Sequence, residues 1–215
     1  MGDIVITTNM SLDGVIQDPD GHEGFARGGW FEEFGGADLG AWAELETAEA
    51  LAAEAMLLGR NTDEWFASRW TSRTGVWADK LNGLPKYVVS SNLVSPRWSN
   101  ATVLRGDLVQ EITQLKQAYE GEILVYASYE LVRALVEHGL ADQLRLVVFP
   151  AILGGGRRLF GDTLEAKRVR LVAARTLGEN LTFMNYEFLE VTDTKAEAAP
   201  EIREPPLTFG SGGRI

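Results

Sequence analysis

Three short polar segments stand where a predicted buried strand gives way to a predicted helix. At such junctions the first amides of the helix lack partners and the positive end of its dipole faces outward, which favours bound anions. If the three strands are parallel neighbours, the segments meet at one edge of the sheet, where they could hold several phosphates in a row. The segments are Gly59-Arg60-Asn61-Thr62, Ser90-Ser91 and Ala127-Ser128.

An arginine and several hydroxyls beside helix N-termini suit one monophosphate and one pyrophosphate, the pattern of a dinucleotide with a 2′-phosphate. The sequence lacks the Rossmann fingerprint, because no G-x-G-x-x-G follows a predicted strand. Gly154-Gly155-Gly156 instead follows a strand that ends in Pro150. An NADP site in this chain therefore requires another fold.

Cysteine and histidine chemistry has little support in this chain. The chain contains no Cys, which excludes disulfides, thiolate catalysis and Cys-ligated zinc, and its only histidines are His22 and His138. Two histidines give poor support to a His-based metal site or a Ser-His-Asp triad. We expect no metal site.

Residues 122–160 set the order of elements on which the third junction depends. Their apolar pattern predicts a strand at residues 123–125, a helix around residues 131–136 and a second strand at residues 144–149. A connector of this length predicts a right-handed crossover between two parallel neighbours. Gly139 is placed to end the helix in a left-handed conformation.

The remaining elements follow from shorter apolar runs and from capping residues. Thr62 is the predicted N-cap of a helix that follows the first junction, and Asp107 caps a helix that ends at Gly121. Further strands are predicted at residues 4–8, 56–58, 87–89 and 102–104, and an antiparallel pair at residues 169–174 and 181–189.

Residues 21–40 interleave seven glycines with aromatic side chains. Two interpretations stand side by side: a mobile lid over a ligand, or a surface loop whose aromatic side chains pack into the core. Residues 41–55 then predict a helix by their Ala, Leu and Glu content. Its acidic residues are expected to form a solvated face, with the alternative that one of them points into a pocket. These acids are Glu44, Glu46, Glu49 and Glu54.

Length and composition fit one globular domain, or at most two small ones, and we expect one domain at residues 1–192. Residues 193–215, rich in Pro and Gly, are expected to form a disordered or loosely docked tail. The chain has 215 residues and a formal net charge of -11, which argues against general binding to nucleic acid or anionic membranes. No apolar run approaches the roughly 20 residues that cross a bilayer, and the N-terminus lacks a signal-peptide pattern. We expect a cytoplasmic protein.

Five segments together resemble the dihydrofolate-reductase-like superfamily, and within it the reductase domain of the bifunctional riboflavin-biosynthesis deaminase/reductase and its stand-alone relatives. The resemblance covers about residues 3 to 190, and it depends on the order and spacing of motifs that are each weak alone. They are Ser11-Leu12-Asp13-Gly14, Leu58-Gly59-Arg60-Asn61-Thr62, Tyr87-Val88-Val89-Ser90, residues 131–146, and the run from Pro150 through Gly154-Gly155-Gly156 to Phe160.

This resemblance implies an α/β fold with a mixed, mainly parallel sheet flanked by helices, NADPH bound across the strand ends, and a homodimer. Residues Gly59, Arg60, Asn61, Thr62, Ser90 and Ser91 would meet the adenosine 2′-phosphate. Residues Ala127, Ser128, Tyr129, Glu130 and Leu131 would meet the pyrophosphate. The family commonly has glycine where this chain has Ala127, and a methyl group there would crowd the approach of backbone to phosphate.

The implied chemistry is hydride transfer from the nicotinamide to a polarised C=N or C=O of a pteridine- or pyrimidine-like heterocycle. A proton must also arrive, and Asp13 is the first candidate, with a turn-forming role before Gly14 as the alternative. Arg157 is a candidate for binding a substrate phosphate, or for a surface salt bridge. Trp30 either covers a ligand ring or belongs to the core.

Two other functions fit the same residues. The departure at Ala127 and the aromatic residues of the predicted lid are compatible with a flavin or deazaflavin in place of NADPH. A non-catalytic ligand-binding protein on the same fold is the third interpretation, because a fold alone does not fix function.

Overall fold

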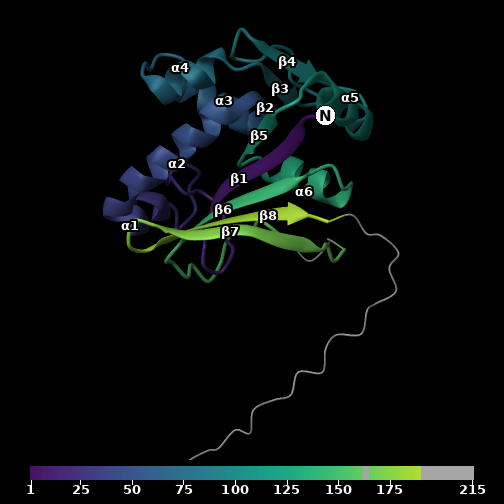
Figure 1. Cartoon of the computed structure of the whole chain (residues 1–215). Helices are drawn as coiled ribbons and strands as arrows, with labels where there is room; N and C mark the ends of the chain where they lie inside the picture. The colour runs from purple at the N-terminus through teal and green to yellow at the C-terminus, as the bar shows by residue number, and fades with distance from the viewer. Residues whose placement is uncertain (162–164, 190–215) are drawn as a thin grey trace, which may run out of the picture.

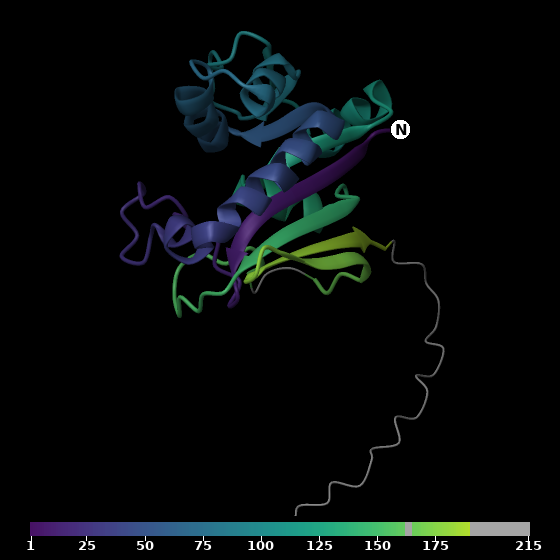
Figure 2. The same ribbon diagram turned by 60° about the vertical axis from the view of Figure 1, so that its left-hand side comes forward.

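An eight-stranded sheet runs through the molecule and separates two groups of helices (Figures 1 and 2). The computed structural model describes residues 1–161 and 165–189. The strands lie in the order β4-β3-β2-β5-β1-β6-β8-β7, in which β1 to β6 are parallel and the β6–β8 and β8–β7 pairings are antiparallel. This is the predicted sheet. The strands are β1 (Asp3–Ser11), β2 (Ala53–Gly59), β3 (Lys86–Val89), β4 (Ala101–Leu104), β5 (Glu122–Tyr126), β6 (Gln143–Phe149), β7 (Val169–Leu177) and β8 (Leu181–Phe188).

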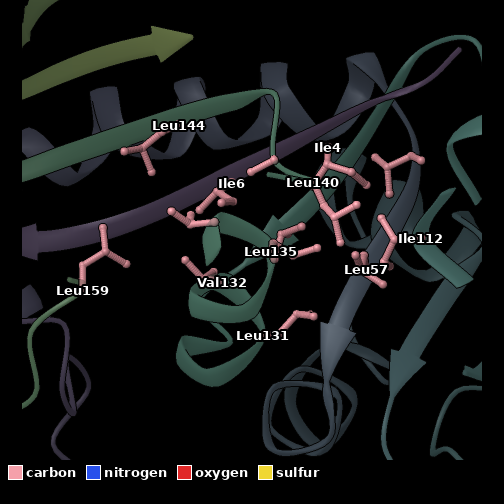
Figure 3. Packing of buried hydrophobic residues seen from close by; sticks show 14 of the residues in the cluster. Ile4, Ile6, Leu57, Ile112, Leu131, Val132, Leu135, Leu140, Leu144 and Leu159 are labelled. Carbon is pink, nitrogen blue, oxygen red and sulfur yellow. The ribbon is translucent and has the colours of Figure 1, made fainter. Parts of the chain in front are cut away.

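Helices cover both faces of the sheet because its central strands are apolar on both sides. One face packs against α5 and α6, and Figure 3 shows Ile4 and Ile6 of β1 meeting Val132 and Leu135 of α6. The other face packs against α1 to α4, where Val5 lies opposite the side chains of α3. The helices are α1 (Trp30–Gly35), η1 (Gly36–Asp38), α2 (Leu39–Ala52), α3 (Arg60–Trp70), α4 (Val76–Gly83), α5 (Leu108–Ala118) and α6 (Tyr129–Glu137).

The predicted β5–α6–β6 unit is present, but its two strands are not neighbours. β1 lies between them and pairs in parallel with both. The reason is visible in β1 itself, where the side chains of Ile4, Val5 and Ile6 are fully buried on alternating faces. A strand that is apolar on both faces gains most from a central position, and the N-terminal strand takes it.

Two local predictions are wrong and two are confirmed. Residues 53–55 belong to β2 rather than to the preceding helix. Thr62 lies inside α3, whose N-cap is Gly59. Asp107 does cap α5, because its carboxylate accepts a hydrogen bond of 3.0 Å from the amide of Gln110. Gly139 has the expected left-handed conformation, with φ of 65°. The predicted tail at residues 193–215 lies outside the described residues.

Residues 21–40 are fastened by two buried aspartates. The Asp18 carboxylate accepts hydrogen bonds from the amides of Glu23 and Phe25. Asp38 accepts from the amides of Glu179 and Asn180 in the β7–β8 turn, at 2.9 Å and 2.8 Å. These donors lower the pKa of Asp38, because they stabilise its ionised form. The arrangement favours the interpretation in which the aromatic side chains of this stretch pack into the core.

The buried lysine at the start of β3 was not singled out from the sequence. Lys86 is fully buried, and its ammonium group donates to the carbonyl oxygens of Leu84 and Asn82, at 2.7 Å and 3.3 Å. It also lies 4.4 Å from the centre of the Trp98 ring. Burial lowers the pKa of Lys86 to about 8, and the nearby Asp63 carboxylate opposes this shift only in part.

This pKa predicts a pH dependence of stability. Between pH 8 and the ordinary lysine value of 10.5, the unfolded chain binds more protons at Lys86 than the folded chain, so the free energy of unfolding rises with pH. From pH 7.5 to pH 10, we expect the free energy of unfolding of wild type to rise by about 2 kcal/mol relative to that of Lys86→Met, measured by urea denaturation. Lys80→Met on α4, where the side chain is only half-buried, is the control and should show no such growth. A flat difference for Lys86→Met would contradict the lowered pKa.

Candidate active site

The three predicted junctions meet at one edge of the sheet. β3, β2 and β5 are adjacent and parallel, so their carboxyl ends point the same way. Gly59 pairs with Val89, which places the Ser90 segment directly beside the Gly59 segment. The neighbour relation on which the anion-site prediction depends is therefore present.

A chain of hydrogen bonds joins the β2–α3 junction to the β5–α6 junction. The amide of Gly59 donates to the Ser128 hydroxyl at 3.0 Å, and that hydroxyl donates to the Thr62 hydroxyl, also at 3.0 Å. A Cβ atom at Gly59 would lie 3.6 Å from the Ser128 side chain, which is ordinary contact distance. Arg60 and Asn61 stand exposed beside this bridge, in the first turn of α3.

The β5–α6 junction has an unusual backbone. Ala127 and Ser128 are both left-handed, with φ of 45° and 55°, a region that side chains other than glycine rarely adopt. α6 begins immediately afterwards, so the amides of Tyr129, Glu130 and Leu131 lie in its first turn, where a helix provides no acceptor for them. The Leu131 side chain is buried in the core, and only its backbone is available to a ligand.

The β3 junction contributes hydroxyls that are already engaged with their own loop. The Ser90 hydroxyl accepts from the amides of Asn92 and Leu93, at 3.3 Å and 3.1 Å. The Ser91 hydroxyl donates to the Asn92 side chain at 2.8 Å. Ser91 is exposed and Ser90 is half-buried, so a ligand reaches Ser91 more easily.

Arg157 stands beside the α6 end of the site. Its guanidinium lies 5.1 Å from the centre of the Tyr129 ring, and its amide donates to the Gln17 side chain at 2.9 Å. The side chain is exposed and therefore free to meet an anion near the first turn of α6. This position suits a phosphate of either the cofactor or the substrate.

Asp13 holds a turn together. Its carboxylate accepts from the Ser11 hydroxyl at 2.7 Å and from the amides of Leu153 and Gly154 at 3.0 Å and 2.9 Å. Burial raises the pKa of Asp13, but these three donors outweigh it and lower the pKa to about 2. A carboxyl group with this pKa holds no proton near neutral pH, so the structure supports the turn-forming role and not the role of proton donor.

Trp30 belongs to the core. The side chain is fully buried, it packs edge-on against Phe149 with ring centres 5.3 Å apart, and its indole N–H donates to the carbonyl oxygen of Gln17. The ring therefore presents no surface to a ligand. Of the two predicted roles, the structure supports packing.

Sequence reasoning missed a buried polar cluster under α2. Glu46 and Glu49 are each only 5% exposed, where a solvated face was expected. They share the face of α2 with Leu45 and Trp42, at spacings of three, four and seven residues, and this shared helical face was the available signal. Glu44 and Glu54 are exposed, as expected.

Residues 1–161 and 165–189 contain neither a cluster of metal-binding side chains nor a membrane-spanning helix. No group of three His, Cys, Asp or Glu side chains in these ranges could hold a metal ion. No helix in the same ranges is long and apolar enough to cross a membrane.

The mixed, mainly parallel sheet flanked by helices is that of the dihydrofolate-reductase-like fold. Comparison with known proteins gives the narrower assignment. Residues 3–183 match the family described as the RibD C-terminal domain, and the chain belongs to that family. Homologues of this family include reductases of riboflavin biosynthesis.

Solved structures of similar fold include riboflavin-biosynthesis proteins. A putative riboflavin biosynthesis protein from Shewanella sp. PV-4 has a TM-score of 0.67 at 20% identity, covering 87% of this chain and 99% of the other. RibD from Acinetobacter baumannii has a TM-score of 0.61 at 16% identity, covering 88% of this chain and 58% of the other. At these identities the likeness concerns the fold alone.

One curated relative is similar in sequence. The uncharacterized protein YyaP of Bacillus subtilis (strain 168) is 26% identical over 90 residues, which cover 42% of this chain. The alignment spans about half the length of that relative, 48%.

The left-handed backbone at Ala127 yields a stability prediction. We expect Ala127→Gly to raise the free energy of unfolding by about 0.5–1 kcal/mol, because relief of a left-handed cost of ~1–2 kcal/mol exceeds the added flexibility of glycine in the unfolded chain. Ala134→Gly, inside α6, is the matched control and should lower it by about 1 kcal/mol. Urea denaturation measures both, and equal losses in the two variants would refute strain at Ala127.

Proposed function

We propose that this chain is an NADPH-dependent reductase that transfers a hydride to a pteridine- or pyrimidine-like heterocycle. The observation that carries the proposal is the hydrogen-bonded bridge from Gly59 through Ser128 to Thr62, which joins two helix N-termini at one sheet edge. Family membership supports the same assignment. A riboflavin-pathway reduction of 5-amino-6-(5-phosphoribosylamino)uracil or a reduction like that of dihydrofolate both fall in this class.

Different residues at the sheet edge suit the 2′-phosphate and the pyrophosphate of NADPH. Arg60, exposed beside Asn61 and Thr62, is assigned to the 2′-phosphate together with Ser90 and Ser91. The first turn of α6 is assigned to the pyrophosphate, because its free amides and dipole favour negative charge. The bound dinucleotide supplies the hydride, and the protein positions it and excludes water.

We assign the substrate side to the neighbourhood of Arg157. Its exposed guanidinium lies near the first turn of α6 and can pair with a phosphate on the substrate. Asp13 and Trp30 keep structural roles, so the proton has to come from another group. A homodimer is part of the proposal on family grounds, and sedimentation analysis tests it.

Titration of the intrinsic tryptophan fluorescence with NADPH, and in parallel with NADH, is the direct test. The chain has six Trp residues. Saturable quenching with NADPH preferred over NADH supports the proposal. Failure to bind either nucleotide contradicts it, and visible absorbance of the purified protein would then point to a flavin or deazaflavin. Tight NADPH binding without oxidation by any heterocycle would favour a non-catalytic ligand-binding protein.

A variant sharpens the assignment of the 2′-phosphate. We expect Arg60→Ala to weaken NADPH binding about 10-fold or more while changing NADH binding little, because a charge-assisted pair with the 2′-phosphate exists only in the NADPH complex. Arg69→Ala at the other end of α3 is the control, since its guanidinium pairs with Asp20. Equal losses for both nucleotides with Arg60→Ala would remove the 2′-phosphate from this junction.

A further inference from the structure

The buried face of α2 carries carboxyl groups toward the carboxyl end of β1. The indole N–H of Trp42 donates to the Asn9 side chain at 2.9 Å, and the Thr7 hydroxyl donates to the Glu49 carboxylate at 2.9 Å. Later residues of the helix therefore lie over earlier residues of the strand, and α2 runs antiparallel to β1. Glu46 lies between Trp42 and Glu49 on this face, over the stretch from Thr7 to Asn9.

That stretch is where β5 ends. Thr7 pairs with Tyr126, the last residue of β5, and the β1–β5 ladder extends no further among the described residues. β1 continues to Ser11 beside β6 alone. The chain leaving β5 becomes the junction of Ala127 and Ser128. Glu46 thus lies at the level where the sheet gives way to the proposed pyrophosphate junction.

Several polar atoms around Tyr126, on which Glu46 also acts, are buried without hydrogen-bond partners. They are the Tyr126 hydroxyl, the Oε1 atom of Glu49 and the indole nitrogen of Trp77, within the part of the chain that the structure describes. Tyr126 is 5% exposed; burial raises the pKa of its hydroxyl, and the charges of Glu46 and Glu49 raise it further. Buried polar groups in native proteins are normally satisfied by protein, water or ligand. The cluster therefore has capacity for a polar group that enters it.

The charges that face the two carboxyl groups differ. Glu49 has the Thr7 hydroxyl as a donor and the Arg145 guanidinium 3.7 Å from its Oε1 atom, and Arg145 is also paired with Glu122 of β5. Burial raises the pKa of Glu49, while Arg145 and Thr7 oppose this shift. Arg175 of β7 adds a smaller opposing effect.

Glu46 has no such support. Burial raises its pKa well above the ordinary value, and the neighbouring Glu49 carboxylate raises it further. These opposing contributions favour the protonated form at Glu46 and the ionised form at Glu49, which faces Arg145. Glu46 is therefore a better candidate to carry a proton than Asp13, which its hydrogen-bond donors hold ionised.

We propose that Glu46 is the proton donor for the reduction and that Glu49 and Arg145 are its positioning residues. This inference rests on the proposed reductase function. In the reaction, the substrate carbon of the C=N or C=O bond gains a hydride and the nitrogen or oxygen gains a proton. The O–H bond of Glu46 breaks, its carboxylate remains, and solvent returns the proton afterwards. The reduced dinucleotide is oxidised in the same step.

Infrared spectroscopy tests the protonation state without cofactor or substrate. A protonated carboxyl group absorbs at a higher frequency than a carboxylate, so the difference spectrum between wild type and Glu46→Gln at pH 7 should contain a carboxylic acid band. Glu44→Gln, on the exposed side of the same helix, is the matched control and should remove only carboxylate absorption. A Glu46 difference spectrum that contains only carboxylate bands at pH 7 would overturn the proposal.

Single-turnover hydride transfer tests the role in the reaction. We expect Glu46→Gln to bind NADPH as wild type does and to slow hydride transfer about 100-fold or more, because a positioned acid contributes 10²–10⁴-fold. Wild-type transfer should slow as pH rises through the pKa of Glu46, and the variant should lose this dependence. Glu44→Gln should match wild type throughout.

The failures of the two proposals are distinguishable. If wild type neither binds NADPH nor reduces any heterocycle, the proposed function fails and the proton donor fails with it. If wild type reduces a heterocycle and Glu46→Gln does so at the same rate with the same pH dependence, only the assignment of Glu46 is overturned. Because Gln has the shape of protonated Glu, the variant is expected to fold, and its free energy of unfolding checks this.

Discussion

Parallel pairing among β3, β2, β5 and β1 is the constraint on which the rest of the structure depends. It sends every carboxyl end to one edge of the sheet, so that residues 60, 90 and 128 lie near one another despite their distance in sequence. The bridge from Gly59 to Ser128 and Thr62 exists because β2 and β5 are neighbours. The same constraint places α2 over the end of β5, where two carboxyl groups are removed from water. Site and fold are thus consequences of a single strand order.

The fold was largely predictable from the sequence, because apolar runs, caps and glycine turns are local signals. The junctions at Gly59, Ser90 and Ala127 were found in this way, and their adjacency needed only the assumption of parallel neighbours. The place of β1 between β5 and β6 was missed, since strand order depends on pairing between residues more than a hundred positions apart. Local signals do not carry that information.

The roles of single polar residues were the least predictable part. Asp13 as a turn former, Trp30 in the core, Lys86 under Trp98 and the buried Glu46 and Glu49 all depend on distant partners. In the sequence, an Asp before Gly looks the same whether its carboxylate is free or accepts hydrogen bonds from two distant amides. A glutamate on an Ala-rich helix reads as solvated until the opposite sheet is known. Burial of a charged side chain is a property of the packed molecule.

The central place of β1 has a consequence for synthesis. Its two partner strands begin at Glu122 and Gln143, so residues 3–11 have no sheet to join until well over half of the chain has been made. At about 5–20 residues per second, roughly 6–26 s separate the synthesis of β1 from that of its two partner strands. During this interval the apolar side chains of Ile4, Val5 and Ile6 are not yet buried in the core. Burial of this strand therefore depends on the late synthesis of its two neighbours.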